Sequence, residues 1–111
     1  MPVTPSYRTY IEEQLGRIEP VRTRAMFGGV GIYAGGLFFA LMDDDRLYFK
    51  VDDGNRPDFE REGMSAFHPF DDASRAMQYY EVPERVLEDP EELEAWMRKA
   101  IAVAAKVRKR T

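Results

Sequence analysis

The sequence contains no cysteine and only one histidine, His68. Without cysteine the chain can form no disulfide bond, no thiolate metal site and no cysteine nucleophile, and it suits a reducing compartment. It also has no uninterrupted apolar run near the roughly 20 residues that a membrane-spanning helix needs. The first ten residues lack the charged and then apolar pattern of a signal peptide. We therefore expect a cytoplasmic protein.

An excess of positive charge is missing as well, because 20 acidic residues outnumber 16 basic ones and the formal net charge is −4. The whole molecule repels phosphate backbones, so a nucleic-acid contact would need a local basic patch. Hydrophobic residues make up 44% of the sequence and charged residues 32%, a mixture typical of a folded protein with a solvated surface. We expect residues 1–111 to form one domain around one core.

Three segments have patterns typical of helices. Thr4-Pro5 reads as an N-cap followed by proline at the first helical position, and apolar residues then recur on one stripe as far as Pro20. A short helix is predicted over residues 58–62, with a glycine after it. The last and longest helix begins at Asp89-Pro90, with Glu92 in the position that completes a capping box.

Strands are predicted where β-branched and aromatic residues gather between turn signals. The five segments are residues 22–34, 36–42, 46–51, 66–70 and 77–82. The resulting order, α-β(3)-α-β(2)-α, predicts an α+β fold with a five-stranded, mainly antiparallel sheet and helices packed on one side. Phe38 and Tyr48, with Tyr33 as a third candidate, are expected on the other side of the sheet, where they form more aromatic surface than a solvated face needs.

Gly28, Gly29 and Gly31 form a glycine cluster that is compatible with phosphate binding. A phosphate-binding loop, however, opens directly into a helix, whereas Ile32 and Tyr33 continue a strand. We therefore interpret Gly28-Gly29 as a bulge within the first strand. A small-ligand or enzymatic pocket beside this bulge is the alternative interpretation.

No set of catalytic or metal-binding residues emerges from the sequence. His68 has no cysteine and no second histidine to share a metal, and no motif joins it to a serine and a carboxylate. Two acidic runs, residues 43–45 and 52–53, bracket one predicted strand and so lie at its opposite ends. We predict solvated turns there, and no catalytic residue, metal or cofactor.

Two groups of basic residues are candidates for binding. The first, at the end of the last helix, comprises Arg98, Lys99, Lys106, Arg108, Lys109 and Arg110. These cations could bind phosphate or an acidic protein, and they also complement the helix macrodipole. Arg22, Arg24 and Lys50 lie among aromatic residues on strands, as on an RNA-binding sheet, but residues 47–51 lack the signature of that fold.

The run from Arg24 to Tyr33 is followed by three further motifs, residues 37–41, 47–51 and 79–83, and by the helix of Trp96. With these motifs the sequence resembles the N-terminal domain of the TfoX/Sxy competence regulators over roughly residues 7–105. The residues that carry this resemblance include Arg24, Met26, Phe27, Gly28, Gly29, Gly31, Tyr33, Tyr48, Lys50, Tyr80 and Pro83. The resemblance implies the same order of elements, no known catalytic residues, and regulation of competence genes through protein contacts. Regulators of this family add a helical C-terminal domain that these 111 residues do not include.

We therefore expect a non-enzymatic protein-interaction domain that acts as a transcriptional co-regulator, with a protein partner or a second copy as its ligand. Its expected partner surface comprises Phe38, Tyr48, Arg98, Lys106, Arg108, Lys109 and Arg110. A small-ligand domain and weak nucleic-acid binding through the basic end of the last helix are the alternatives.

Overall fold

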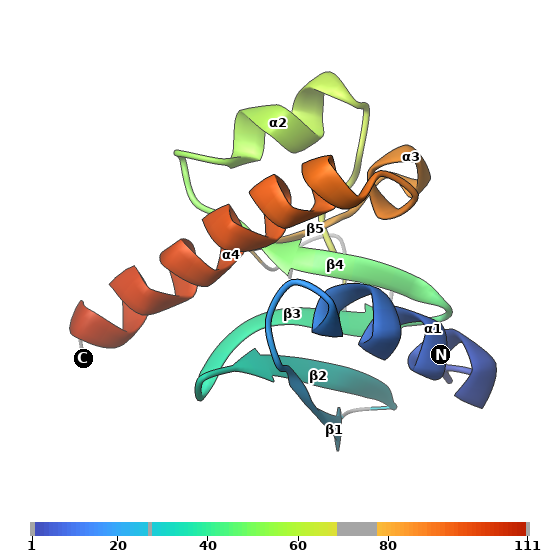
Figure 1. Cartoon of the computed structure of the whole chain (residues 1–111). Coiled ribbons are helices and arrows are strands. Elements are labelled where there is room, and N and C mark those ends of the chain that lie inside the picture. Colours follow the sequence, from blue (N-terminus) through green and yellow to red (C-terminus); the bar gives the residue numbers. More distant parts are fainter. Residues whose placement is uncertain (1, 27, 69–77, 111) are drawn as a thin grey trace.

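The structure, a computed structural model, describes residues 2–26, 28–68 and 78–110, and side chains as far as residue 108. Its elements, in chain order, are α1 (Pro5–Gly16), β1 (Arg22–Met26), β2 (Gly29–Ala34), β3 (Leu37–Asp43), β4 (Arg46–Lys50), α2 (Arg56–Arg61), β5 (Tyr79–Glu81), α3 (Glu84–Leu87) and α4 (Pro90–Arg110) (Figure 1). None of the helices in these described ranges is long and apolar enough to cross a membrane.

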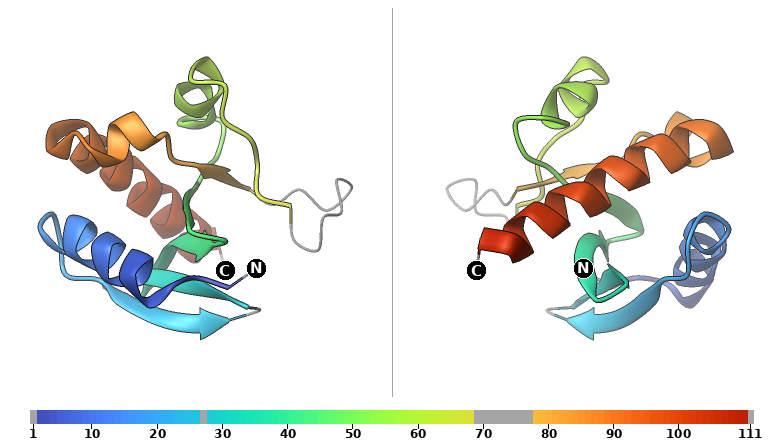
Figure 2. Two further views of the ribbon diagram at one scale, coloured as in Figure 1. Left: turned by 90° about the vertical axis from the view of Figure 1, so that its right-hand side faces the viewer. Right: turned by 60° about the vertical axis from the view of Figure 1, so that its left-hand side comes forward.

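The five strands form one antiparallel sheet in the order β1-β2-β3-β4-β5, so that every strand pairs with its neighbour in the chain. Helices α1, α3 and α4 lie to one side of this sheet (Figure 2, left). Residues from all four helices join the inner sheet face in one apolar core. The predicted α+β class, the five strands and the one-sided packing of the helices are confirmed.

We predicted three strands before the short helix and two after it, whereas the structure has four strands before α2 and one after it. Residues 22–34 form two strands, β1 and β2, and Gly28 lies in the connection between them with a φ of +81°. The predicted bulge at Gly28-Gly29 is therefore wrong, because glycine in the left-handed region here allows the chain to reverse direction. The register irregularity of the sheet lies instead between β2 and β3, at Ile32 and Tyr33.

The predicted strand over residues 66–70 is also absent from the described part of the chain. Only Ala66 forms a bridge, to Tyr80, while Phe67 and His68 belong to no strand and residues 69–70 lie outside the described ranges. The predicted strand over residues 77–82 is β5. Two backbone hydrogen bonds hold residues 65–67 against β5: Phe67 N–H donates to the Tyr79 carbonyl at 2.7 Å, and Glu81 N–H donates to the Ser65 carbonyl at 3.1 Å.

Helices α1 and α2 follow the predicted signals with shifted ends. Thr4 caps α1, accepting a hydrogen bond from the Tyr7 N–H at 3.3 Å, but α1 ends at Gly16 and not near Pro20. Helix α2 begins two residues before the predicted start, and Gly63 follows it in the left-handed region at φ +72°. Helix α3, a single turn after Pro83, was not predicted.

Helix α4 begins as predicted, with Asp89 as its cap. The Asp89 carboxylate accepts hydrogen bonds from the N–H groups of Glu91 and Glu92, at 3.1 and 3.2 Å, and thereby satisfies donors that the first turn leaves free. The Glu92 side chain does not complete a capping box, because its carboxylate pairs with Arg85. The competing cation explains why only half of the predicted motif forms.

The core lies between the helices and the inner face of the sheet. Its largest fully buried side chains include Phe39, Phe49 and Phe59, and the ring of Phe59 meets Trp96 edge-on at 4.7 Å. Burial of each such ring contributes about 1.5–3 kcal/mol. The register shift lets consecutive residues, Phe39 and Ala40, both enter this core. As a result, Phe38 and Leu41 of β3 face the opposite side of the sheet.

Candidate functional site: the outer face of the sheet

The face of the sheet turned away from the helices carries a second cluster of apolar and aromatic side chains. We call it the outer face; its members are Arg22, Arg24, Tyr33, Phe38, Leu41, Tyr48, Lys50 and Tyr79. Its rings form a connected row, since Tyr33 stacks on Phe38 at 5.1 Å between centroids and Phe38 meets Tyr79 at 5.6 Å. The predicted aromatic surface on this side of the sheet is thus present.

Not all of this aromatic surface is open to a partner. Tyr48 is 8% exposed, and Phe67 packs on its ring at 5.0 Å. Tyr79 is 3% exposed, whereas Tyr33 and Phe38 are half-buried. The accessible rings therefore lie at the end of the outer face formed by β1, β2 and the start of β3.

The glycine motif shapes the same region. Arg24 pairs with Gly31 across β1 and β2, and Arg22 pairs with Tyr33, so both arginines stand on the outer face. A Cβ atom at Gly31 would lie 2.7 Å from Met26 Cε and 3.1 Å from Phe38 Cε1. Glycine at this position is what allows Met26 and Phe38 to lie against the backbone of β2.

Gly29 has an equally specific role in packing. A Cβ atom there would lie 2.5 Å from the carbonyl oxygen of Met42, on the neighbouring strand β3. The close approach of the two backbones fills the space that a ligand beside Gly29 would occupy on that side. The backbone of β3 therefore leaves no room for the alternative small-ligand pocket on the side of Gly29 that faces Met42.

A shallow open groove lies at the opposite end of the β1–β2 hairpin. Its lining comprises Pro20, Val21, Arg22, Thr23, Arg24, Tyr33, Gly35 and Gly36. Within the described residues, neither Arg22 nor Arg24 forms an ion pair or a side-chain hydrogen bond, and both are exposed. The groove thus offers two guanidinium groups beside a tyrosine ring.

Lys50 adds a third cation deeper on the outer face. Its Nζ lies 4.8 Å from the centre of the Tyr79 ring and donates to the Tyr79 hydroxyl at 3.3 Å. Burial lowers the pKa of Lys50, since no carboxylate in the described part of the chain pairs with it. Burial, together with Tyr33, raises the pKa of Tyr79 to about 12. An anion arriving here would stabilise the charged amine.

The charges at the other end of the outer face are already balanced. Tyr48 pairs with Glu81 across β4 and β5, and Glu81 raises the pKa of Arg46 more than any other group does. The neighbouring Tyr48 hydroxyl raises the pKa of Arg46 further. Among the described residues of the outer face, Arg22 and Arg24 at the β1 end and Lys50 on β4 are therefore the cations without a carboxylate partner.

The basic residues of α4 are engaged mainly within the protein. Arg98 pairs with Glu19 at 2.7 Å, Lys99 with Asp58 at 2.8 Å, and Lys106 with Asp52 at 3.5 Å. The Arg108 guanidinium reaches the turn at Gly36, at 3.6 Å from the position of a Cβ atom there, and the side chains of Lys109 and Arg110 lie outside the described part. These pairs tie α4 to the segment between α1 and β1, to α2 and to the loop after β4.

The acidic turns likewise have internal roles. Asp44 and Asp45 both adopt positive φ angles, of 52° and 53°, between β3 and β4, and the Asp45 carboxylate accepts from the Thr4 N–H at 2.8 Å. Asp52 accepts from the Gly54 N–H at 2.8 Å. Among the described residues no group of three acidic or histidine side chains could hold a metal ion. His68 is exposed.

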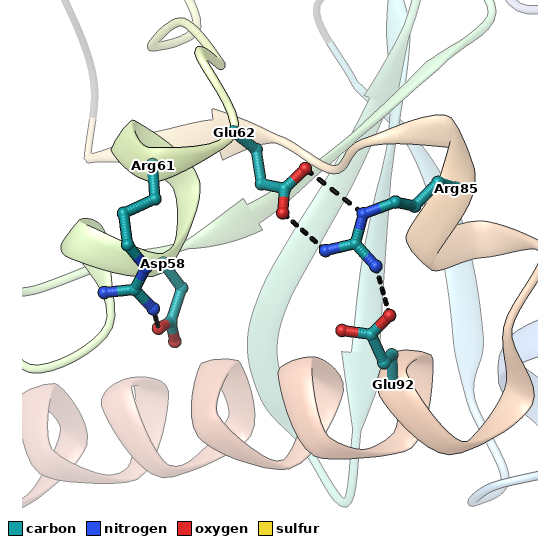
Figure 3. A network of polar contacts seen from close by, with 5 residues as sticks. All are labelled: Asp58, Arg61, Glu62, Arg85 and Glu92. Carbon is teal, nitrogen blue, oxygen red and sulfur yellow. Dashed lines mark hydrogen bonds and ion pairs between the residues drawn. The ribbon is translucent and has the colours of Figure 1, made fainter.

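Sequence reasoning missed a polar cluster between α2, α3 and α4 (Figure 3). Arg85 on α3 donates to both carboxylate oxygens of Glu62, from Nε at 3.2 Å and from its second terminal nitrogen, and its remaining nitrogen pairs with Glu92. The bond from Arg85 lowers the pKa of Glu62. Nearby, Asp58 pairs with Arg61. This cluster joins the end of α2 to α3 and to the first turn of α4.

A comparison with protein-family models matches residues 13–104 to the TfoX N-terminal domain. The chain belongs to the TfoX N-terminal domain family. The residues behind the predicted resemblance lie in several places in this TfoX domain. Arg24, Tyr33, Tyr48 and Lys50 belong to the outer face, and Gly31 lies against Met26 and Phe38. Gly28 lies between β1 and β2, and Gly29 begins β2. Tyr80 packs on Phe59 in the core, and Pro83 precedes α3. Phe27 lies outside the described residues. A comparison with curated proteins found no match.

Proposed function

We propose that this TfoX N-terminal domain is a non-enzymatic protein-interaction module of the regulatory type, acting in the cytoplasm as a transcriptional co-regulator. The family is competence-related and regulatory, and it is not a known enzyme family. The observation that carries the proposal is the β1 end of the outer face. There Arg22 and Arg24 have no partner among the described residues and stand beside the half-buried rings of Tyr33 and Phe38.

Arginine beside tyrosine is the combination that dominates the energetics of protein interfaces. A guanidinium can bind a carboxylate through two hydrogen bonds, and an aromatic ring supplies a large apolar area at low entropic cost. Tyr48 is buried beneath Phe67, so Phe38 and Tyr33 take the place that we expected for Phe38 and Tyr48. The described cations of α4 contribute less, because ion pairs within the domain occupy Arg98, Lys99 and Lys106.

Affinity capture from the native cell extract tests this proposal when it is run with paired variants. Tyr33→Ala removes an accessible ring of the outer face, and Tyr10→Ala removes a ring that is 39% exposed on α1, away from this face. We expect a protein that the unmodified domain retains and that Tyr33→Ala loses, with Tyr10→Ala unchanged. Thermal unfolding of both variants serves as the control for folding.

Two results would contradict the proposal. The first is equal recovery of every captured protein by all three domains. The second is a small metabolite or nucleotide that raises the melting temperature at the same groove, since a ligand that binds only the folded state stabilises it by mass action. That second result would favour the small-ligand alternative.

A further inference from the structure

Strand β1 has one edge without a neighbour. It is the terminal strand of the sheet and pairs only with β2, and no backbone hydrogen bond in the described chain joins residues 22–26 to another segment. β1 runs along the lower border of the sheet in Figures 1 and 2. The opposite border is different, because residues 65–67 cover β5. Unpaired backbone groups on an edge can accept an additional strand.

Side chains of α1 hold β1 in place through hydrogen bonds to Thr23. The Thr23 hydroxyl donates to Glu12 at 2.6 Å and accepts from Arg8 at 2.8 Å, which fastens β1 to α1. Its five residues contain no proline. A strand that is already ordered loses little further entropy when a partner binds, and so it is suited to recognition.

We propose that the free edge of β1 binds an extended acidic segment of a protein partner as a sixth strand, and this rests on the proposed function. Neighbouring strands lie about 4.8 Å apart, and side chains directly across a strand pair have Cβ atoms about 5 Å apart. Arg22 and Arg24 are two positions apart and stand on the same face. Carboxylates at alternate positions of the added strand would therefore meet both guanidinium groups.

The charges of the edge select the occupant. Pairing of β1 with β1 of a second copy would bring Arg22 and Arg24 of both chains together, and like charges across a strand pair are destabilising. A nucleic acid could contact the guanidinium groups but has no peptide backbone to pair with the free edge. An acidic peptide strand satisfies both the backbone groups and the two cations.

The test uses the full 111-residue chain and short synthetic peptides with glutamate at alternate positions. Affinity is measured by titration, and the contacted residues by amide chemical shifts and hydrogen exchange. We expect the glutamate peptide to bind and to protect amides of β1. The same peptide with lysine in place of glutamate, or with alternate backbone nitrogens methylated on the pairing edge, should bind at least about tenfold more weakly.

Charge reversal supplies the matched variants. The double variant R22E/R24E should lose the glutamate peptide and gain the lysine peptide, whereas Arg17→Glu, an exposed position at the end of α1, should behave like the unmodified chain. An unchanged affinity in the methylated peptide would overturn strand addition, because charge contact alone would then explain binding. Dimerisation through β1, or an oligonucleotide that shifts the same amides in place of the peptide, would also overturn it.

The two proposals fail in different ways. If Tyr33→Ala weakens partner capture while neither peptide binds at millimolar concentration, the interaction module stands and the β1 edge is not its binding element. If Tyr33→Ala leaves all capture unchanged, the proposed function itself fails.

Discussion

Replacing Gly29 by alanine adds a single methyl group on β2 where the backbone of β3 lies directly against the glycine. The new Cβ atom would lie 2.5 Å from the Met42 carbonyl oxygen, well inside contact distance, and that oxygen belongs to the backbone of a central strand. No side-chain rotation can relieve the overlap, so the two strands must separate locally. Overpacking of this kind costs about 1–3 kcal/mol, and we expect the upper half of that range because backbone must move.

The matched control is Gly16→Ala at the end of α1. A Cβ atom at Gly16 meets no heavy atom within 4 Å, and its φ does not lie in the left-handed region. Alanine should therefore be neutral there or stabilise by up to about 1 kcal/mol, through lower entropy of the unfolded chain. The two variants carry the same chemical change and should shift stability in opposite directions.

Urea unfolding, followed by circular dichroism and by the fluorescence of Trp96, measures both variants. With a denaturant dependence of about 1–3 kcal/mol per molar urea, Gly29→Ala should lower the transition midpoint by about 0.7–3 M. A midpoint within about 0.3 M of the unmodified chain would refute the reasoning. It would mean that the Met42 carbonyl does not lie as close to Gly29 as the structure places it.

Three further perturbations probe the outer face, the cap of α4 and the polar cluster. Above pH 10.0 the unfolded chain should ionise Tyr79 before the folded chain does, because folding raises the pKa of Tyr79 to about 12. The free energy of unfolding should therefore fall by up to about 2–3 kcal/mol between these two pH values. Tyr79→Phe should remove this part of the pH dependence in urea unfolding at alkaline pH. Asp89→Ala should destabilise by about 1 kcal/mol through loss of the α4 cap, and an unchanged melting temperature would speak against the cap. Arg85→Gln should destabilise the domain more at neutral pH than near about pH 3. Arg85 lowers the pKa of Glu62 below its ordinary value of 4.5, so the pair stabilises the fold above pH 4.5 and this stabilisation is lost as the pH falls. An equal effect of the variant at both pH values would contradict this.

Local signals located the helices well. Thr4 and Asp89 are caps in the structure as in the sequence, because a cap acts through its own side chain and the next three backbone groups. The predicted end of α1 was wrong, because Arg17, Ile18 and Glu19 already turn back onto the Leu15 carbonyl. The partner of Glu92 was missed, because Arg85 belongs to another helix. Arg85 comes from α3, a segment that carries no strong helix pattern of its own.

The candidate site shows the same division. The aromatic residues of the outer face were predicted from alternation along the strands, and Phe38 and Tyr33 are there. The burial of Tyr48 under Phe67 could not be predicted, because Phe67 comes from a segment that was assigned to a strand. Arg22, considered only for RNA binding, gains its importance from pairing with Tyr33 on an edge strand.

Composition, caps and strand patterning determined an α+β domain, because those features act over a few neighbouring residues. The family came from a resemblance of ordered motifs, residues 24–33, 37–41, 47–51 and 79–83, and the family comparison agrees with it. Only the tertiary structure decided which charges are already satisfied. The cations of α4 looked free in the sequence and are paired with Glu19, Asp58 and Asp52, from segments far away in the chain. Arg22 and Arg24 find no carboxylate in the described chain, since the strand on which they stand has neither helix nor neighbouring strand beyond its outer edge.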